Sequence, residues 1–209
     1  MDVTPVTLEG PRVRLEPMRL DHYQRLVEIG LGQDIFRYFP IAIDTKEQML
    51  AYVQHSVAAT DSGEMLVWVT VPRELDEPIG ATSYLNIDRR NRKLEVGGTW
   101  IAPQWQRTAC NTEAKYLQLC HAFETLGCVR VEFKTDSLNA KSRAALLRIG
   151  AVEEGTMRNH IIMPDGRFRH SVYFSVIDSE WPSVKEPCDP ASQGMIGSTM
   201  DGDATPGRG

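Results

Sequence analysis

Residues 103–113 read Pro-Gln-Trp-Gln-Arg-Thr-Ala-Cys-Asn-Thr-Glu and join two hydrophobic patterns of different period. A strand-like run ends near Ile101, and a helical run begins near Asn111. A short turn between a strand and a helix start directs free backbone N–H groups and the positive end of the helix toward one point. Such a point binds anions, most often phosphate. The sequence therefore predicts a phosphate-binding loop here.

The composition is that of one soluble globular domain. The chain has 209 residues, 42% of them hydrophobic and 24% charged, and its net charge is -5. A negative net charge argues against a protein that coats nucleic acid. No apolar run approaches the ~20 residues that span a bilayer, and the N-terminus lacks the pattern of a secretory signal. We therefore expect a cytoplasmic protein with no nucleic-acid or membrane partner.

The four cysteines predict free thiols rather than a disulfide framework. They lack CxxC spacing, which also argues against a thiolate metal site. No HExxH or EF-hand pattern is present, so no metal site is expected. The cysteines are Cys110, Cys120, Cys128 and Cys188.

The hydrophobic periodicity predicts a mixed α/β fold built on one central sheet. Strand patterns occupy 12–17, 65–71, 78–87, 94–102, 129–133, 155–163 and 168–177. Helix patterns run from Asp21, as N-cap, to Ile29, from a capping box at Thr45 to Ala58, from Asn111 or Thr112 to Leu126, and over 139–149. The strand–helix–strand unit over 94–133 predicts one parallel strand pair.

The composition changes near Glu186, where Gly, Pro, Ser and Asp replace apolar residues. A segment with so little apolar surface cannot form a packed core. We therefore expect one domain over 1–185 and a disordered tail over 186–209.

The phosphate loop belongs to an ordered set of motifs. The set comprises Leu94–Ile101, Gln106–Asn111, Asn139–Arg143, Glu154–His160 and Ser179–Lys185. Together these motifs resemble the Gcn5-related N-acetyltransferase (GNAT) family, and most closely its ribosomal-protein-alanine acetyltransferase (RimJ/RimL) type. The resemblance implies a mostly antiparallel sheet of about six or seven strands, splayed around a CoA cleft, with helices on both faces.

The resemblance implies acetyl-CoA as cosubstrate and a primary amine as acceptor. Loop N–H groups would hold the pyrophosphate, and the edge of the preceding strand would pair with the pantetheine arm. The implied cofactor-binding residues are Trp100, Ile101, Ala102, Gln106, Arg107, Thr108, Ala109, Cys110, Asn111, Thr112, Asn139 and Ser142. Acceptors that stay open include protein N-termini and small-molecule amines, and a homodimer also stays open.

Acyl transfer to an amine needs a base for the amine and a proton for the leaving thiolate. Glu95 is the predicted base, because this strand borders the substrate cleft in the family. Ser142 is the predicted proton donor, because Leu146 stands where many members have a tyrosine. The alternatives are an exposed strand-edge charge for Glu95 and a helix-start residue that satisfies backbone for Ser142.

Two departures from the family pattern keep further hypotheses open. The loop has Ala109 and Asn111 where the family usually has glycine, and a glycine allows close approach of a ligand. A CoA-binding protein with impaired catalysis, which Ala109 and Leu146 suggest, is one alternative, and a transferase for another acyl-CoA such as succinyl-CoA is a second. Cys110 offers a covalent acyl-enzyme, and His160 either faces the cleft or lies at the surface or in the core.

Overall fold

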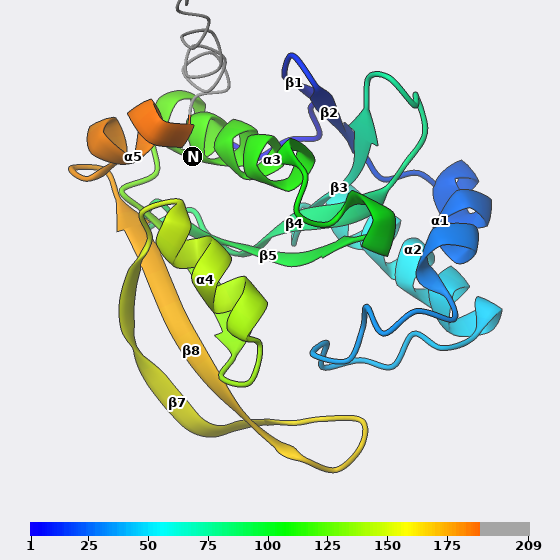
Figure 1. Ribbon diagram of the computed structural model, residues 1–209. Helices are drawn as coiled ribbons and strands as arrows, with labels where there is room; N and C mark the ends of the chain where they lie inside the picture. Colours follow the sequence, from blue (N-terminus) through cyan, green and yellow to red (C-terminus); the bar gives the residue numbers. More distant parts are fainter. Residues whose placement is uncertain (189–209) are drawn as a thin grey trace, which may run out of the picture.

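Eight strands form one sheet in the computed structural model, which describes residues 1–188 (Figure 1). The sheet order is β1-β2-β3-β4-β5-β6-β8-β7, and every neighbouring pair is antiparallel except β5 and β6. The strands are β1 (Leu8–Glu9), β2 (Val13–Pro17), β3 (Leu66–Pro72), β4 (Gly80–Asp88), β5 (Lys93–Ile101), β6 (Arg130–Asp136), β7 (Val152–Ile162) and β8 (Phe168–Ile177).

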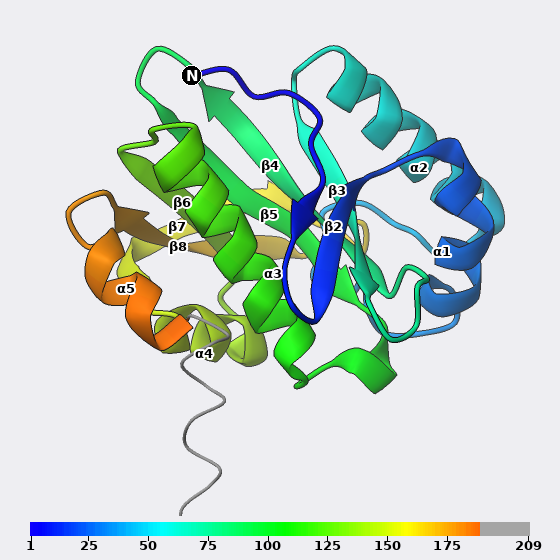
Figure 2. The ribbon, with the colours of Figure 1, turned by 90° about the horizontal axis from the view of Figure 1, so that it is seen from above.

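Helices lie on both faces of this sheet (Figure 2). None of those in residues 1–188 is long and apolar enough to cross a membrane. They are α1 (Tyr23–Gly30), α2 (Lys46–Asp61), α3 (Ala109–Cys120), α4 (Ala140–Arg148) and α5 (Trp181–Cys188), with short 3-10 turns at Leu20–His22 and Pro103–Trp105 and a π-turn at His121–Thr125.

The two faces have separate hydrophobic cores, because successive side chains of a strand point to opposite faces. On β3, Leu66 and Trp68 join the core under α3, α4 and α5. Val67 and Val69, which alternate with them, join the core under α1 and α2. The sheet is therefore buried on both sides at its centre, and a residue's parity along a strand decides which core it enters.

The parallel pair of β5 and β6 is short. Its register covers Lys93–Glu95 opposite Arg130–Glu132 and then ends. Beyond that point β5 remains paired with β4 as far as Ile101, while β6 remains paired with β8 as far as Asp136. The two strands thus separate and leave a gap in the sheet, which we call the β5–β6 opening. The predicted parallel pair and the predicted splay are both confirmed.

Several predicted boundaries need correction. Asp21 is no N-cap, because it lies inside the 3-10 turn that precedes α1. Helix α3 begins at Ala109, two or three residues earlier than the predicted Asn111 or Thr112, because the Thr108 side chain caps it. Helix α5 extends through Cys188, so the predicted tail begins too early, and residues 189–209 lie outside the described part. The eighth strand is β1, which is too short for a periodicity to reveal.

The capping box of α2 is confirmed, and its apolar face is partly confirmed. Thr45 Oγ1 accepts from Gln48 N–H, while the Gln48 side chain accepts from Thr45 N–H at 3.1 Å. The spacing of apolar residues in this segment predicts a buried stripe of Met49, Tyr52, Val53, Val57 and Ala58. Met49 and Val53 are buried, but Ala58 is exposed. The buried residues of the last turn are Ala59 and Thr60 instead, so the predicted stripe is displaced by one residue there.

A buried carboxylate ties α3 to the β1–β2 hairpin. Glu113 is 2% exposed, and its Oε1 accepts hydrogen bonds from the backbone N–H groups of Arg12 at 2.7 Å and Val13 at 3.0 Å. The Arg12 guanidinium lies 3.5 Å from Oε2. Because one carboxylate satisfies two backbone donors, it fixes the helix against the edge of the sheet.

We expect Glu113→Ala to lower the free energy of unfolding by about 2–3 kcal/mol, because two backbone donors lose their charged acceptor. Urea denaturation followed by circular dichroism measures the change. The matched control is Glu9→Ala, which removes an exposed ion pair with Arg73 and should cost less than about 1 kcal/mol. Equal losses in the two variants would contradict the role of Glu113.

Candidate functional site

The predicted phosphate loop is held by its own side chains. Thr108 Oγ1 donates to Trp105 C=O at 2.8 Å and accepts from Cys110 N–H at 3.4 Å. Arg107 has a φ of +64°, the left-handed conformation, which turns the chain into the helix. The first turn of α3, which includes Thr112, therefore presents unpaired backbone N–H groups at the mouth of the β5–β6 opening.

Ala109 fits the loop without backbone strain. It is the first residue of α3 and is absent from the residues with positive φ, so the usual glycine is not needed for its conformation. Asn111 contributes a buried side-chain oxygen, Oδ1, that has no hydrogen-bond partner in residues 1–188. A buried polar atom of this kind calls for a partner, which fits a ligand with donor groups at the start of α3.

The edge of β5 offers one free backbone donor. Ala102 donates its N–H to Ile79 C=O at 2.8 Å, and its own C=O accepts from Trp105 N–H. Because backbone groups of an antiparallel pair alternate in direction, Ile101 points its N–H and C=O away from β4. The Gln106 side chain donates to the Ile101 C=O at 3.1 Å. The Ile101 N–H is therefore the donor that faces the β5–β6 opening, and Ala102 has no free donor.

Trp100 brings only backbone near this edge. Its side chain is 3% exposed and lies in the core under α1 and α2. The indole contacts Phe36 edge-on with ring centroids 5.2 Å apart, and Nε1 donates to Tyr52 Oη at 3.4 Å. The ring therefore anchors β5 from the face opposite to α3.

The start of α4 lies on the other side of the opening. Asn139 Oδ1 accepts from Ser142 N–H at 3.1 Å and caps the helix. The amide Nδ2 of Asn139 remains available as a donor, and the Ser142 side chain is half-buried. Leu146 is 3% exposed and belongs to the hydrophobic core. The structure thus brings Asn139 and Ser142 to the opening and gives Leu146 a packing role.

Glu95 lies at the point where β5 and β6 separate, on the face opposite to α3. It is 3% exposed, so the alternative of an exposed surface charge is wrong. Its Oε2 accepts from Asn86 Nδ2 at 2.7 Å and from Lys134 Nζ at 3.2 Å. The ammonium group balances the buried charge, and neither contact uses Oε1.

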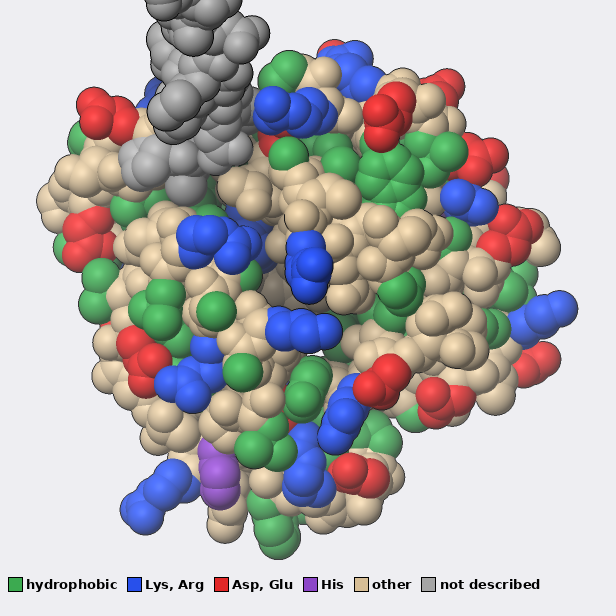
Figure 3. Space-filling view, viewed as in Figure 1, with side chains coloured by type: hydrophobic (Ala, Val, Ile, Leu, Met, Phe, Trp, Pro, Cys, Tyr) green, Lys and Arg blue, Asp and Glu red, His purple; other side chains and the backbone are tan. Residues whose placement is uncertain are grey.

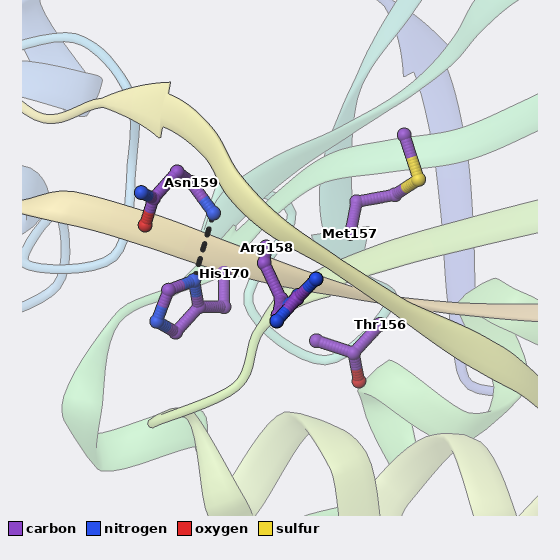
Figure 4. A pocket seen from close by; sticks show the side chains of 5 residues that line it. All are labelled: Thr156, Met157, Arg158, Asn159 and His170. Carbon is purple, nitrogen blue, oxygen red and sulfur yellow. Dashed lines mark hydrogen bonds between the residues drawn. The ribbon is translucent and has the colours of Figure 1, made fainter.

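A wide bulge in β7 supplies a histidine to the same face. Three residues, 158–160, oppose one residue of β8, and Asn159 has a φ of +48°. The Asn159 N–H donates to His170 Nδ1 at 2.8 Å, beside an open pocket of about 670 Å³ (Figure 4). Bulges of this kind redirect side chains. Here His160 lies within hydrogen-bond distance of Ser171 Oγ, at 3.0 Å.

Charge and burial together set the protonation of His160. Its Nε2 lies 3.5 Å from Tyr173 Oη, and the Lys134 ammonium lies over the Tyr173 ring at 5.8 Å. Desolvation lowers the pKa of His160, and the positive charges of Lys134 and Arg169 lower it further, against an opposing effect of Glu95. The imidazole is therefore neutral at neutral pH and able to accept a proton.

The sequence patterns do not predict two residues of this cluster, Lys134 and Tyr173. Both lie on strands in which alternate residues are apolar, so they read as solvent-facing positions. A register between β5 and β6 would have found Lys134, because it has the same parity as Glu95 across the parallel pair. Cys110 is buried and makes no hydrogen bond with a histidine in residues 1–188, which gives a thiol nucleophile no base.

Lys and Arg side chains surround a hollow near the centre of the face that carries α3 and α4 (Figure 3). A positive rim attracts anions and concentrates them at the hollow. The rim, the unpaired N–H groups of α3 and the free Ile101 N–H all suit a long anionic ligand that ends inside the sheet.

Comparisons with known proteins agree with this geometry. The family model described as "Acetyltransferase (GNAT) domain" matches residues 12–152. A solved GCN5-related N-acetyltransferase from Brucella melitensis is 28% identical, with a TM-score of 0.81 over 94% of this chain and 90% of that chain.

Two curated relatives from Bacillus subtilis are also similar. The protein named "Putative ribosomal N-acetyltransferase YdaF" is 37% identical over 106 residues, which are 51% of this chain and 57% of that protein. The protein named "Uncharacterized N-acetyltransferase YoaA" is 23% identical over 79% of this chain and 94% of its own length. The predicted family and the predicted enzyme class, an N-acetyltransferase, are confirmed, and the chain belongs to the GNAT family of acetyltransferases.

Proposed function

We propose that the protein transfers the acetyl group of acetyl-CoA to a primary amine by direct attack. The observation that carries this proposal is the β5–β6 opening, which has anion-binding N–H groups at one end and Glu95 at the other. Family membership supports acetyl-CoA as the donor, and acetyl-CoA supplies an acyl thioester whose carbonyl carbon is open to attack. The amine and the catalytic residues are our assignment.

The residues at the opening fit the cosubstrate. The N–H groups of 107–111 bind the pyrophosphate at the start of α3. The Ile101 N–H donates to a carbonyl of the pantetheine arm, which pairs with the edge of β5 like an added strand. Asn139 donates through Nδ2 to the pantetheine arm, and the Ser142 hydroxyl donates a hydrogen bond to the leaving sulfur. Ala102 serves only to fix the course of the chain after β5.

Glu95 accepts the proton that the attacking amine loses, directly or through one water. Its Oε1 is the oxygen free for this step, because Asn86 and Lys134 both bind Oε2. His160 lies on the same face, and its imidazole is neutral because its pKa is lowered. It can therefore accept a proton at the same end of the site. The acceptor therefore approaches from the face opposite to α3.

The N-terminus of a ribosomal protein is the first acceptor to test. The name of the relative YdaF includes the word ribosomal, and that relative is 37% identical over the matched segment. Small-molecule amines form the second class. One of the two reasons to consider a CoA-binding protein without catalysis no longer holds, because Ala109 adopts its conformation without strain. Succinyl-CoA or another acyl-CoA remains a competing donor.

A transfer assay tests the proposal directly. Acetyl-CoA and succinyl-CoA are each offered with peptides that copy ribosomal-protein N-termini and with a set of polyamines and amino acids, and products are identified by mass spectrometry. We expect acetyl transfer to the α-amine of at least one peptide. If CoA binds in native mass spectrometry but no acyl group leaves with any acceptor, the impaired-protein alternative is correct.

Asn139→Ser should weaken CoA binding about tenfold, because it removes the amide donor but keeps a side-chain oxygen that caps α4. Calorimetry measures the affinity, and an unchanged melting temperature shows that the cap survives.

Ser142→Ala should lower kcat with little change in CoA affinity. An unchanged kcat in Ser142→Ala would remove this hydroxyl from the mechanism.

Glu95→Gln should lower kcat by about 100-fold, because the amide cannot accept the amine proton. The affinity for CoA should not change, since Glu95 faces the acceptor side of the sheet. Glu153→Gln is the control, because Glu153 is an exposed carboxylate of β7 that pairs with Arg143. If Glu95→Gln keeps the wild-type pH profile of kcat, another group is the base.

His160 should titrate below the ordinary histidine pKa of about 6.5 in NMR spectra of the folded protein. Lys134→Met should raise that pKa, because a nearby positive charge is lost. The folded pKa lies below the unfolded one, so the histidine's contribution to stability is present above the unfolded pKa and is lost as the pH falls toward the folded pKa. A His160 pKa at or above the ordinary value would show that burial and Lys134 do not act on this histidine as described.

A further inference from the structure

Lys115 is a buried cation with no balancing carboxylate in the part of the chain that the structure describes. It lies in the middle of α3 and is 8% exposed. In residues 1–188 its ammonium makes no ion pair or hydrogen bond, and Nζ lies 5.7 Å from the centre of the Phe133 ring. A buried unpaired charge is costly, and replacing it with an apolar group would be favourable. The charge therefore points to a role outside folding.

Its neighbours place Lys115 at the β5–β6 opening. Phe133 follows directly after Glu132, the last residue of β6 that is paired with β5. Gln118, one helical turn after Lys115, accepts from Thr82 Oγ1 at 3.2 Å, and Thr82 Oγ1 lies 2.7 Å from Thr99 Oγ1 of β5. Residues three apart share a helix face. Lys115 thus lies over the gap between Thr99 on β5 and Phe133 on β6.

Other unpaired polar atoms lie on the same face of α3. Asn111 Oδ1 and Gln118 Nε2 are buried without partners in the described residues, and these residues flank Lys115 at spacings of four and three. This polar line starts at the phosphate loop. From Thr108 to Lys115 the helix rises about 10 Å, less than the reach of an extended pantetheine arm. A chain bound at the loop can therefore place its far end at Lys115.

We propose that the Lys115 ammonium stabilises the CoA thiolate that leaves in the transfer step and gives it a proton. The proposal rests on the proposed acetyl transfer. In that step the amine nitrogen bonds to the carbonyl carbon, the carbon–sulfur bond breaks, and its electron pair stays on sulfur. The sulfur then takes a proton from Lys115, and Glu95 takes the proton that the amine loses. Solvent restores both groups, so charge and protons balance.

The acidity of Lys115 suits this step. Burial lowers the pKa of its ammonium group to about 8, close to that of an ordinary thiol. Proton transfer between groups of matched pKa is efficient near neutral pH. A hydroxyl such as that of Ser142 is a much weaker acid and carries no positive charge, so its hydrogen bond alone leaves the thiolate without a proton.

The other titratable groups around α3 have separate surroundings. Glu113 faces the β1–β2 hairpin, and Tyr84 donates to the backbone of Gln118. Burial lowers the pKa of His121 and raises the pKa of Cys128 to about 11. Burial is the sole cause of the lowered pKa of Lys115, and none of these four groups contributes to it.

The test compares Lys115→Met with the wild-type protein, using CoA itself as the probe. The thiol of bound CoA is titrated by the ultraviolet absorbance of its thiolate. We expect the thiol pKa to rise by about one unit or more in Lys115→Met, because the nearby positive charge is lost. Lys141→Met, which removes an exposed lysine at the start of α4, is the control and should leave the titration unchanged.

Stability and turnover give two further readouts. Lys115→Met should be at least as stable as the wild type in urea, since an unpaired buried charge is removed. Its kcat for acetyl transfer should fall about 100-fold. The fall in wild-type kcat at high pH, which follows deprotonation of Lys115, should be absent from the pH profile of the variant. A destabilised variant with an unchanged thiol titration would overturn the proposal and give Lys115 a structural role.

The outcomes also separate this proposal from the proposed function. If the thiol titration shifts as expected but no acceptor receives an acetyl group, the role of Lys115 at the CoA thiolate is upheld and the acceptor assignment fails. If transfer occurs and Lys115→Met keeps both the wild-type titration and kcat, the transfer stands and the role of Lys115 is overturned. If wild-type CoA does not bind, both proposals fall.

Discussion

The separation of β5 from β6 is the constraint on which the site depends. The two strands are parallel, so both end at the same edge of the sheet, and the segments that follow them meet there. The phosphate loop follows β5 and the start of α4 follows β6. Because the pair stops at Glu95, the later part of β5 keeps an unpaired backbone donor at Ile101, which a ligand can satisfy.

Charges buried on the two faces of this opening are treated differently. On one face Lys134 balances Glu95, so the pair is satisfied before any ligand arrives. On the other face Lys115 has no counter-charge among residues 1–188, and Asn111 Oδ1 and Gln118 Nε2 are unpaired in that part of the chain. This asymmetry fits a reaction in which the amine loses a proton on one face and negative charge develops on sulfur at the other.

The sequence predicted most of the elements, because local signals specify them. The change of period at 103–113 marks the loop, and a capping box marks the start of α2. The sequence did not predict the role of Lys134, because a polar residue that alternates with apolar ones on a strand is typical of a solvent-facing position. It did not predict the role of Lys115, because a lysine in a helix is typical of an exposed position. Their burial comes from segments far away in the chain, and it depends on strand register and helix packing that no local pattern contains.

By itself the sequence determined the family and the order of the strands and helices apart from β1 and α5, and it predicted the phosphate loop, because these follow from short-range periodicity and motif spacing. Only the tertiary structure decided which groups face the opening. It left the Ile101 N–H free and Ala102 bonded, put Glu95 beside Lys134, and left the Lys115 ammonium without an ion pair or hydrogen bond among residues 1–188. The physical reason is that the direction of a hydrogen bond and the balance of buried charges depend on which strands pair and which helices pack together. These contacts join segments that are far apart in the chain, so they form only in the folded protein.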